Sequence, residues 1–142
     1  MQVQEIMSRQ VDVIDPNTTI RDAARRLRDD NVGALPVGEG DQLIGMLTDR
    51  DIVVRGVAVG RSDGNAAVRD AMSEGVFYCF DDDDVEKAAQ IMAEHQVRRL
   101  PVLNRDKRLV GIIALADLAR SAPEAGKMAL QGISEPTGKE RR

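Results

Sequence analysis

The sequence contains an internal repeat, and this feature limits the possible folds more than any other. Residues 3–37 align with residues 68–102 at a constant offset of 65, and a turn one residue longer in the second copy then raises the offset to 66. Repeats of this kind are supersecondary units that bury their apolar surface against a neighbour. A cleft between two such units is a common place for a ligand. The identical positions are Val3/Val68, Met7/Met72, Ser8/Ser73, Ala23/Ala88, Ala24/Ala89, Val32/Val97, Leu35/Leu100, Pro36/Pro101, Val37/Val102, Leu43/Leu109, Gly45/Gly111 and Asp51/Asp117.

The repeat divides the chain into three parts. We assign residues 1–60 to the first repeat, residues 65–122 to the second, and residues 123–142 to a C-terminal helix and tail. A unit of about 60 residues is only marginally stable alone, so we expect the two repeats to share one folded module. The glycine-rich segment from Gly56 to Gly64 is typical of a connector. The polar tail from Ser134 is expected to be frayed and partly disordered.

Each repeat predicts the same order of elements after a short initial helix. In the first, Val11 to Ile14 alternates like a strand, and apolar residues then recur at helical spacing from Thr19 to Asp30, with Thr18 or Thr19 as the N-cap. In the second, a strand at Val76 to Phe80 precedes a helix introduced by Asp83 and Glu86, an Asp version of the capping box.

Two further strands and a closing helix follow in each repeat. The strands at 43–47 and 109–113 come directly after a Leu-Pro-Val strand and a short turn, which makes each pair antiparallel. We therefore predict an α+β fold built from two β-α-β-β-α repeats with pseudo-two-fold symmetry. Residues 124–131 could add one more helix.

Composition excludes several classes of protein. The net charge of −4 and the aromatic content of 2% disfavour nucleic-acid binding, which usually needs a basic face and stacking aromatics. No apolar run approaches the ~20 residues of a membrane span, and the first residues lack the pattern of a signal peptide, so we expect a cytoplasmic protein without membrane contact. The single cysteine, Cys79, cannot form an internal disulfide or a cysteine-based zinc site and is predicted to be buried.

The segment Gly45 to Asp51 is the most informative local motif. A buried strand here delivers a glycine, then Thr48, then Asp51 three residues later, at the start of a predicted helix. A carboxylate at this place can accept hydrogen bonds from a ribose diol, while the hydroxyl and the free N–H groups of the first turn can meet a phosphate. The alternative is a capping box without a ligand, with Thr48 as N-cap and Asp51 at N3. The heptapeptide alone favours the capping box.

The repeat, the Val-x-x-Leu-Pro-Val strands and the Gly-x-x-Thr-x-x-Asp segment together resemble the CBS-pair family, also called Bateman modules. The resemblance covers residues from Val3 to Arg120, nearly the whole chain. More narrowly, segments 45–53 and 94–99 are similar to small stand-alone CBS-pair proteins of the hypoxic response protein 1 type. The resemblance implies a tandem CBS pair that acts as a regulatory module for adenosine-containing ligands such as AMP, ADP, ATP or S-adenosylmethionine.

The family pattern assigns the residues of two pockets, each using both repeats. Pocket one would place Asp51 on the ribose and Thr48 near phosphate, with Val97, Arg98 and Arg99 from the second repeat. One of its arginines would meet the phosphate, so pocket one is expected to be the stronger phosphate-bearing site.

Pocket two would use Asp117 with Val32, Gly33 and Ala34 from the first repeat. It lacks the hydroxyl, because Ala114 stands where the first repeat has Thr48, and it lacks the paired arginines. We expect pocket two to be empty or to take an uncharged adenosine-like group.

Other polar residues favour structural roles. His95 lies near a predicted helix end, Asp81 to Asp84 precede a helix as capping and first-turn charges, and the arginines at 25, 26 and 28 fit a solvated face. No catalytic fingerprint occurs, so we expect no enzyme, no metal site and no required cofactor.

The leading hypothesis is a ligand-sensing module that acts on an unidentified protein target or through its own homodimer. The resemblance implies dimer faces at residues 51–59 and 117–122. The alternative is a structural interaction protein without a ligand, acting through its dimer surface alone.

Overall fold

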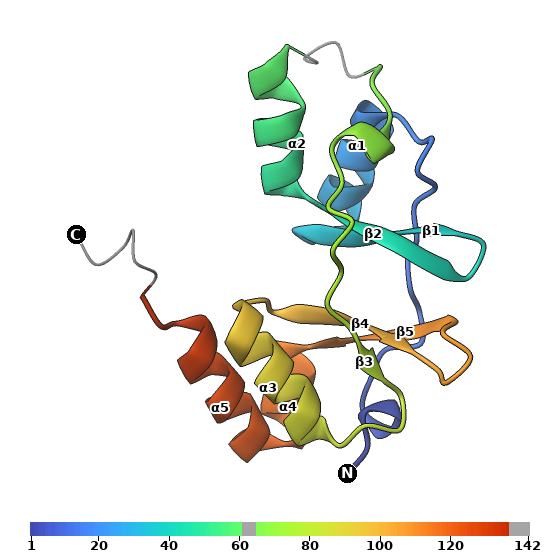
Figure 1. The fold of residues 1–142 in the computed structure, drawn as a ribbon. Helices are drawn as coiled ribbons and strands as arrows, with labels where there is room; N and C mark the ends of the chain where they lie inside the picture. The colour runs from blue at the N-terminus through green and yellow to red at the C-terminus, as the bar shows by residue number, and fades with distance from the viewer. Residues whose placement is uncertain (61–64, 137–142) are drawn as a thin grey trace. The chain divides into compact units, whose positions relative to one another are not determined.

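The computed structural model describes residues 1–60 and 65–136, which belong to two compact units (Figure 1). The first-repeat unit contains Asp12–Val76, and the second-repeat unit contains Met1–Val11 together with the residues from Phe77 onwards. The connector residues 61–64 and the tail residues 137–142 lie outside the described residues.

The N-terminal segment packs with the second repeat, whereas the boundaries drawn from the sequence group it with the first. The backbone N–H of Val3 donates to the carbonyl of Asp83 at 2.8 Å, and that of Ser8 donates to the carbonyl of Ile112 at 2.8 Å. Val3 is fully buried in the core of the second-repeat unit. The compact units therefore differ from the sequence repeats at this end of the chain.

The first-repeat unit is a two-stranded antiparallel sheet covered by helices. Helix α1 begins after Thr19, whose hydroxyl accepts from the backbone N–H of Asp22 at 3.1 Å, so the predicted N-cap is confirmed. The apolar face of α1 packs with the strands around Ile14, Leu35 and Leu47. The elements are α1 (Ile20–Asp30), β1 (Ala34–Glu39), β2 (Gln42–Thr48), α2 (Asp49–Arg55), the 3₁₀ helix η2 (Val57–Val59) and the 3₁₀ helix η3 (Val68–Asp70).

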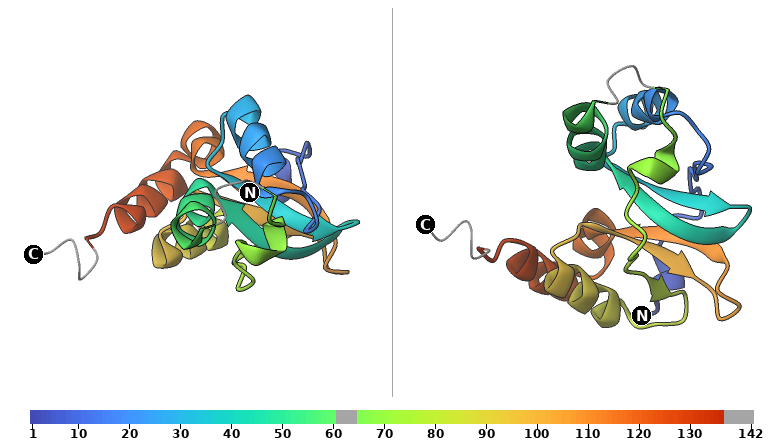
Figure 2. Two further views of the ribbon diagram at one scale, coloured as in Figure 1. Left: turned by 90° about the horizontal axis from the view of Figure 1, so that it is seen from above. Right: turned by 45° about the horizontal axis from the view of Figure 1, so that its top comes forward.

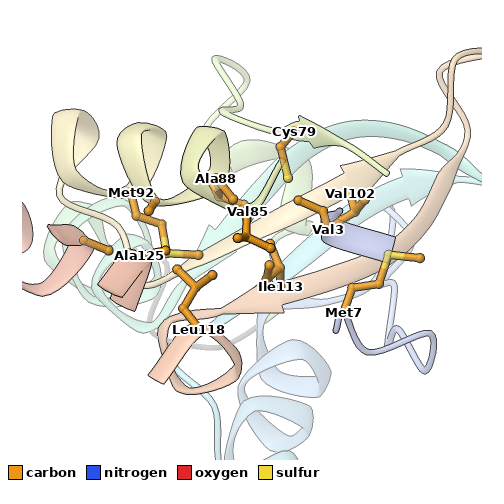
Figure 3. Close-up of a cluster of buried hydrophobic side chains, with 13 residues drawn as sticks. Val3, Met7, Cys79, Val85, Ala88, Met92, Val102, Ile113, Leu118 and Ala125 are labelled. Carbon is orange, nitrogen blue, oxygen red and sulfur yellow. The ribbon is translucent and has the colours of Figure 1, made fainter. Parts of the chain in front are cut away.

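The second-repeat unit has a three-stranded sheet in the order β3-β4-β5, with β3 parallel to β4. Its core joins the sheet to the helices and to the N-terminal segment (Figure 3). Cys79 lies in this core, as predicted. The elements are η1 (Val3–Glu5), β3 (Cys79–Phe80), α3 (Val85–His95), β4 (Arg99–Leu103), β5 (Leu109–Ala114), α4 (Leu115–Ser121) and α5 (Pro123–Ile133).

Two local predictions need correction. The strand predicted at Val11 to Ile14 is a single parallel bridge between Ile14 and Val37, and the one predicted at 76–80 keeps only its last two residues. The N-cap of α3 is Asp84, one residue later than predicted, because the carboxylate of Asp83 already accepts from the backbone N–H of Phe80 at 2.8 Å.

Helix α5 packs along α3 and α4 (Figures 1 and 2). It confirms and slightly extends the helix predicted at 124–131. Gly132 lets the backbones approach, because a β-carbon added there would stand 2.2 Å from the β-carbon of Ala93. The side-chain amide of Gln96 donates to the carbonyls of Gly132 at 3.3 Å and Glu135 at 2.7 Å, which caps the C-terminal end of α5.

Candidate functional site

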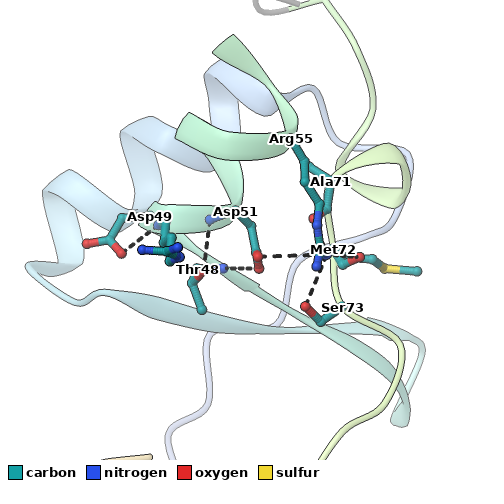
Figure 4. Close-up of polar contacts among 8 residues, drawn as sticks. Thr48, Asp49, Asp51, Arg55, Ala71, Met72 and Ser73 are labelled. Atoms are coloured by element: carbon teal, nitrogen blue, oxygen red, sulfur yellow. Dashed lines mark hydrogen bonds and ion pairs between the residues drawn. The ribbon is translucent and has the colours of Figure 1, made fainter. Parts of the chain in front are cut away.

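Thr48 and Asp51 form a complete capping box at the start of α2 (Figure 4). The hydroxyl of Thr48 accepts from the backbone N–H of Asp51 at 3.0 Å, and Asp51 Oδ2 accepts from the backbone N–H of Thr48 at 3.0 Å. The capping box that the sequence of residues 45–51 predicts as the alternative to a ligand site is therefore present. It does not exclude a ligand, because Thr48 keeps its hydroxyl proton and Asp51 keeps its second oxygen.

The second oxygen of Asp51 faces an arginine that the sequence reasoning missed. Arg55 Nη1 lies 3.8 Å from Asp51 Oδ1 and also donates to the carbonyls of Ala71 at 3.3 Å and Met72 at 3.2 Å. The i, i+4 spacing of Asp51 and Arg55 is the signal that could have revealed this pair. The carboxylate side chain is only 13% exposed, so it is held in a defined place at the edge of the unit.

Asp117 has the same position in the second-repeat unit but a different partner set. Its Oδ2 accepts from the backbone N–H of Ala114 at 2.8 Å, and its Oδ1 pairs with Arg120 Nη2 at 2.7 Å. Ala114 has no hydroxyl to return the bond, so the cap is one-sided. Sequence reasoning also missed Arg120, although its i, i+3 spacing from Asp117 is visible in the sequence.

The strand-entry residues of the second-repeat unit present two cations. The carbonyl of Arg98 accepts from the backbone N–H of Leu115 at 2.8 Å, and Arg99 begins β4 opposite Ala114. Both arginine side chains are exposed, and within residues 1–60 and 65–136 neither has an ion-pair partner. Val97 packs against the core of the same unit. Two such arginines can bind an anion without first breaking another pair.

The equivalent segment of the first-repeat unit, Val32 to Ala34, has no charged side chain and lies beside the carboxylate of Asp49. The carbonyl of Gly33 accepts from the backbone N–H of Asp49 at 3.0 Å, and a β-carbon added at Gly33 would stand 3.5 Å from Asp49 Oδ2. Val32 packs against the core, and Ala34 pairs with Thr48. A carboxylate beside Gly33 disfavours a phosphate at this segment.

The structure therefore brings Thr48 and Asp51 together in one unit, and sets Arg98 and Arg99 beside Ala114 in the other. Each predicted pocket combines residues of both units. The two pocket assignments remain predictions.

The remaining polar candidates have structural roles. His95 stacks on Phe77 with the ring centroids 3.6 Å apart. Burial, with a smaller contribution from the nearby Asp83 carboxylate, raises the pKa of the Cys79 thiol to about 12, which favours the protonated thiol at neutral pH. Hydrogen bonding to Arg105 lowers the pKa of Asp82. The described part of the chain contains no group of three or more His, Cys, Asp or Glu side chains that could hold a metal ion.

One arginine of the cluster predicted to be a solvated face departs from that prediction. Arg26 is half-buried, forms an ion pair with Asp12 and donates to the carbonyl of Val13 at 3.1 Å. Arg25 and Arg28 remain exposed and pair with Asp22 and Asp29.

The described helices include none with both the length and the apolar character needed to span a membrane.

Comparison with known families explains the repeat. The family model of the CBS domain matches residues 3–57 and 68–124. The chain belongs to the CBS-domain family. It is a tandem CBS pair with mixed helix and strand content, as the sequence predicts.

Relatives and solved structures agree with this assignment. The CBS domain-containing protein YhcV of Bacillus subtilis is 45% identical over 134 residues, covering 93% of this chain and 94% of YhcV. Hypoxic response protein 1 of Mycobacterium tuberculosis is 39% identical over 122 residues, covering 85% of each chain.

Solved CBS structures include the 39% identical Hypoxic Response Protein I with two coordinated zinc ions, at a TM-score of 0.78, covering 87% of this chain and 100% of that one. CBSX2 in complex with AMP has a TM-score of 0.76 at 27% identity, covering 87% of this chain and 96% of that one. The CBS pair of MJ0100 with 5′-methylthioadenosine and S-adenosylmethionine has a TM-score of 0.72 at 26% identity, covering 89% and 98%.

Proposed function

We propose that this CBS pair is a regulatory module, without catalytic activity, that binds an adenosine-containing ligand of the AMP, ADP or ATP class. Thr48 and Asp51 would hold the ribose phosphate, and Val97, Arg98 and Arg99 would complete the site. The exposed side chains of Arg98 and Arg99, which form no ion pair within residues 1–60 and 65–136, are the observation that carries this proposal, since they offer two charges to a phosphate. The AMP complex of CBSX2 supports the choice of ligand class.

The second site of the proposal has a different preference. It would use Asp117 with Val32, Gly33 and Ala34, and Asp49 adds a negative charge beside Gly33. We propose that it is empty or takes an uncharged adenosine group. The complex of MJ0100 with 5′-methylthioadenosine and S-adenosylmethionine shows that a related pair binds adenosine compounds without phosphate groups.

Titration calorimetry with AMP tests the main site. Asp51→Asn removes the charge but keeps a carbonyl that can accept from the backbone N–H of Thr48, so the helix cap is retained. Loss of one charge-assisted contact of ~1.5 to 3 kcal/mol should weaken AMP binding roughly 10- to 150-fold. Asp117→Asn makes the same change in the same local structure and is the matched control, expected to leave AMP affinity nearly unchanged.

Equal losses in the two variants would contradict the proposed difference between the sites. A melting experiment addresses the ligand class itself, because a ligand at about one hundred times its dissociation constant adds roughly 2.7 kcal/mol of stability. A melting temperature unmoved by AMP, ADP, ATP and S-adenosylmethionine would instead support the alternative of an interaction protein without a ligand. The cytoplasmic location and the protein target stay predictions.

A further inference from the structure

Arg55, in the last turn of α2, extends its side chain towards Asp51, the carboxylate that we propose binds ribose (Figure 4). Its Nη1 nitrogen lies near four oxygen atoms. Three of them are 3.2 to 3.3 Å away: the carbonyls of Ala71 and Met72 and the hydroxyl of Ser73. The fourth is Asp51 Oδ1, at 3.8 Å. All five residues belong to the first-repeat unit.

The protons on Nη1 decide which of these oxygens is bonded. A terminal guanidinium nitrogen carries two N–H groups, and the three nearer acceptors compete for both. At 3.8 Å, Asp51 Oδ1 lies beyond hydrogen-bond distance. Within residues 1–60 and 65–136, this oxygen accepts no hydrogen bond. Arg55 therefore places a positive charge beside Oδ1 and leaves its lone pairs open to a ligand.

The carboxylate plane of Asp51 is held from both sides. Oδ2 accepts from the backbone N–H of Thr48 at 3.0 Å, and the charge of Arg55 attracts Oδ1. The last torsion of an aspartate side chain is broad, so a bond to one oxygen alone does not fix this plane. A vicinal diol donates one hydrogen bond to each of the two oxygens, and this geometry requires the plane to be fixed.

The second repeat uses its arginine differently. Ser121 stands where the first repeat has Arg55. The carboxylate of Asp117 is instead paired with Arg120, whose Nη2 donates directly to Oδ1 at 2.7 Å. Among the described residues, Arg120 bonds to no backbone carbonyl. The arginine of the first repeat is anchored beside an open carboxylate oxygen, whereas that of the second repeat occupies the oxygen itself.

We propose that Arg55 is a positioning residue of the ribose site, which holds Asp51 so that both carboxylate oxygens accept from the 2′- and 3′-hydroxyl groups of a ribonucleoside. Arg55 does not touch the ligand and acts through Asp51. The site selects a vicinal diol, because a 2′-deoxyribose provides only one of the two hydrogen bonds. This inference rests on the proposed function, since that proposal assigns the ribose to Asp51.

The bonds of Arg55 to residues 71–73 also support the fold. They tie the end of α2 to a segment whose Ser73 exchanges two backbone hydrogen bonds of 2.9 Å with Met46 of β2. A structural role alone would affect every nucleotide equally. A positioning role affects the bond to the 2′-hydroxyl most, and AMP and 2′-deoxy-AMP differ only in that group.

Titration calorimetry of the full chain with AMP and with 2′-deoxy-AMP tests the proposal. The wild type should bind AMP roughly 10-fold or more tightly than 2′-deoxy-AMP, which is the effect of one hydrogen bond to a charged group. Arg55→Met should reduce this ratio roughly threefold or more, because AMP loses more affinity than 2′-deoxy-AMP does. The matched control is Arg25→Met, which removes an exposed arginine paired with Asp22 at 3.2 Å on α1. It should leave both affinities unchanged.

Circular dichroism first establishes that each variant is folded. If Arg55→Met does not fold, Arg55→Lys takes its place, since it keeps the positive charge beside Asp51. An ammonium on a flexible stem orients a carboxylate less strictly than a planar guanidinium does. The ratio of the two affinities should therefore fall in Arg55→Lys as well, by a smaller factor.

Three results would overturn the assignment of Arg55 while AMP still binds. They are a wild-type ratio retained in the folded variants of Arg55, equal losses of affinity for AMP and 2′-deoxy-AMP, and a wild type that binds both nucleotides equally well. The second result would show that Arg55 supports the site as a whole, and the third that the diol is not recognised. A wild type that binds neither nucleotide would refute the proposed function itself, so the two failures are distinguishable.

Discussion

The closing helix of each repeat starts from the same backbone conformation but with different capping residues. The backbone angles are φ −112°, ψ 161° at Thr48 and φ −116°, ψ 159° at Ala114. Asp117 already accepts from the backbone N–H of Ala114 at 2.8 Å, as Asp51 does from Thr48 at 3.0 Å. Only the hydroxyl that would accept from the backbone N–H of Asp117 is missing. Ala114→Thr should therefore complete the capping box without moving the backbone.

The expected gain can be worked from this geometry. Replacing Ala by Thr at an N-cap is worth about 0.5 to 2 kcal/mol, typically ~1. For a chain of this length, 1 kcal/mol corresponds to a rise in melting temperature of roughly 3 to 5 °C. The reverse change, Thr48→Ala, should lower the melting temperature by a similar amount, because it reproduces the natural one-sided cap of α4.

Thermal and urea denaturation followed by circular dichroism measure both changes. Ala114→Val is the control, since it adds a branched side chain of similar size that cannot accept a hydrogen bond. If Ala114→Thr is no more stable than Ala114→Val, the cap of α4 does not work as the cap of α2 does. A Thr48→Ala variant as stable as the wild type would show that the Thr48 hydroxyl does not stabilise α2, which would refute the reasoning.

Two further predictions concern the second-repeat unit. Gln96→Ala removes the amide that caps α5. It should destabilise the chain by about 0.5 to 1.5 kcal/mol and speed hydrogen exchange in the last turn of α5. The control, Gln90→Ala, removes an exposed hydrogen bond to Glu94 within α3 and should have neither effect. The pKa of Cys79 is about 12 in the folded protein, above its value of 9.0 in an unfolded chain, so the native state keeps a proton that the unfolded state loses. The resulting stability is fully present below about pH 9 and is lost as the pH rises towards 12. The difference between the urea midpoints of wild type and Cys79→Ala should therefore shrink from pH 8 to pH 11, and a constant difference would contradict the buried thiol.

Local patterns in the sequence were sufficient for the repeat, for most of the buried helix positions and for the antiparallel strand pairs. The spacing of Ile20, Ala23, Ala24 and Leu27 predicts the buried face of α1. Ile20, Ala23 and Leu27 are buried, and Ala24 is only partly buried. The Leu-Pro-Val strands pair as predicted because a short turn permits only an antiparallel pair. These features depend on interactions between residues close in sequence.

Features that depend on distant residues were not predictable. No local pattern shows that residues 1–11 pack with the second repeat, since their partners, such as Asp83 and Ile112, lie far along the chain. The shortened first strands have the same origin: Ile14 makes one bridge to β1, and only Cys79 and Phe80 pair with β4. The packing of α5 could not be predicted either, because it depends on close approaches of Gly126 and Gly132 to alanines on α4 and α3.

Asp51 and Asp117, the two carboxylates predicted to bind ribose, differ less from each other than the groups around them do. Asp117 is tied more closely to its arginine than Asp51 is, at 2.7 Å against 3.8 Å, so a diol at Asp117 would have to compete with Arg120. Arg120 is 69% exposed, and an ion pair of this kind is worth only about 0 to 1 kcal/mol, or at most roughly fivefold in affinity. The hydroxyl present at Thr48 and absent at Ala114 and the two exposed arginines, Arg98 and Arg99, can each contribute ~1.5 to 3 kcal/mol when they meet a phosphate. Any preference for phosphate at one site should therefore follow these groups and not the two aspartates, which are the same residue type at both sites.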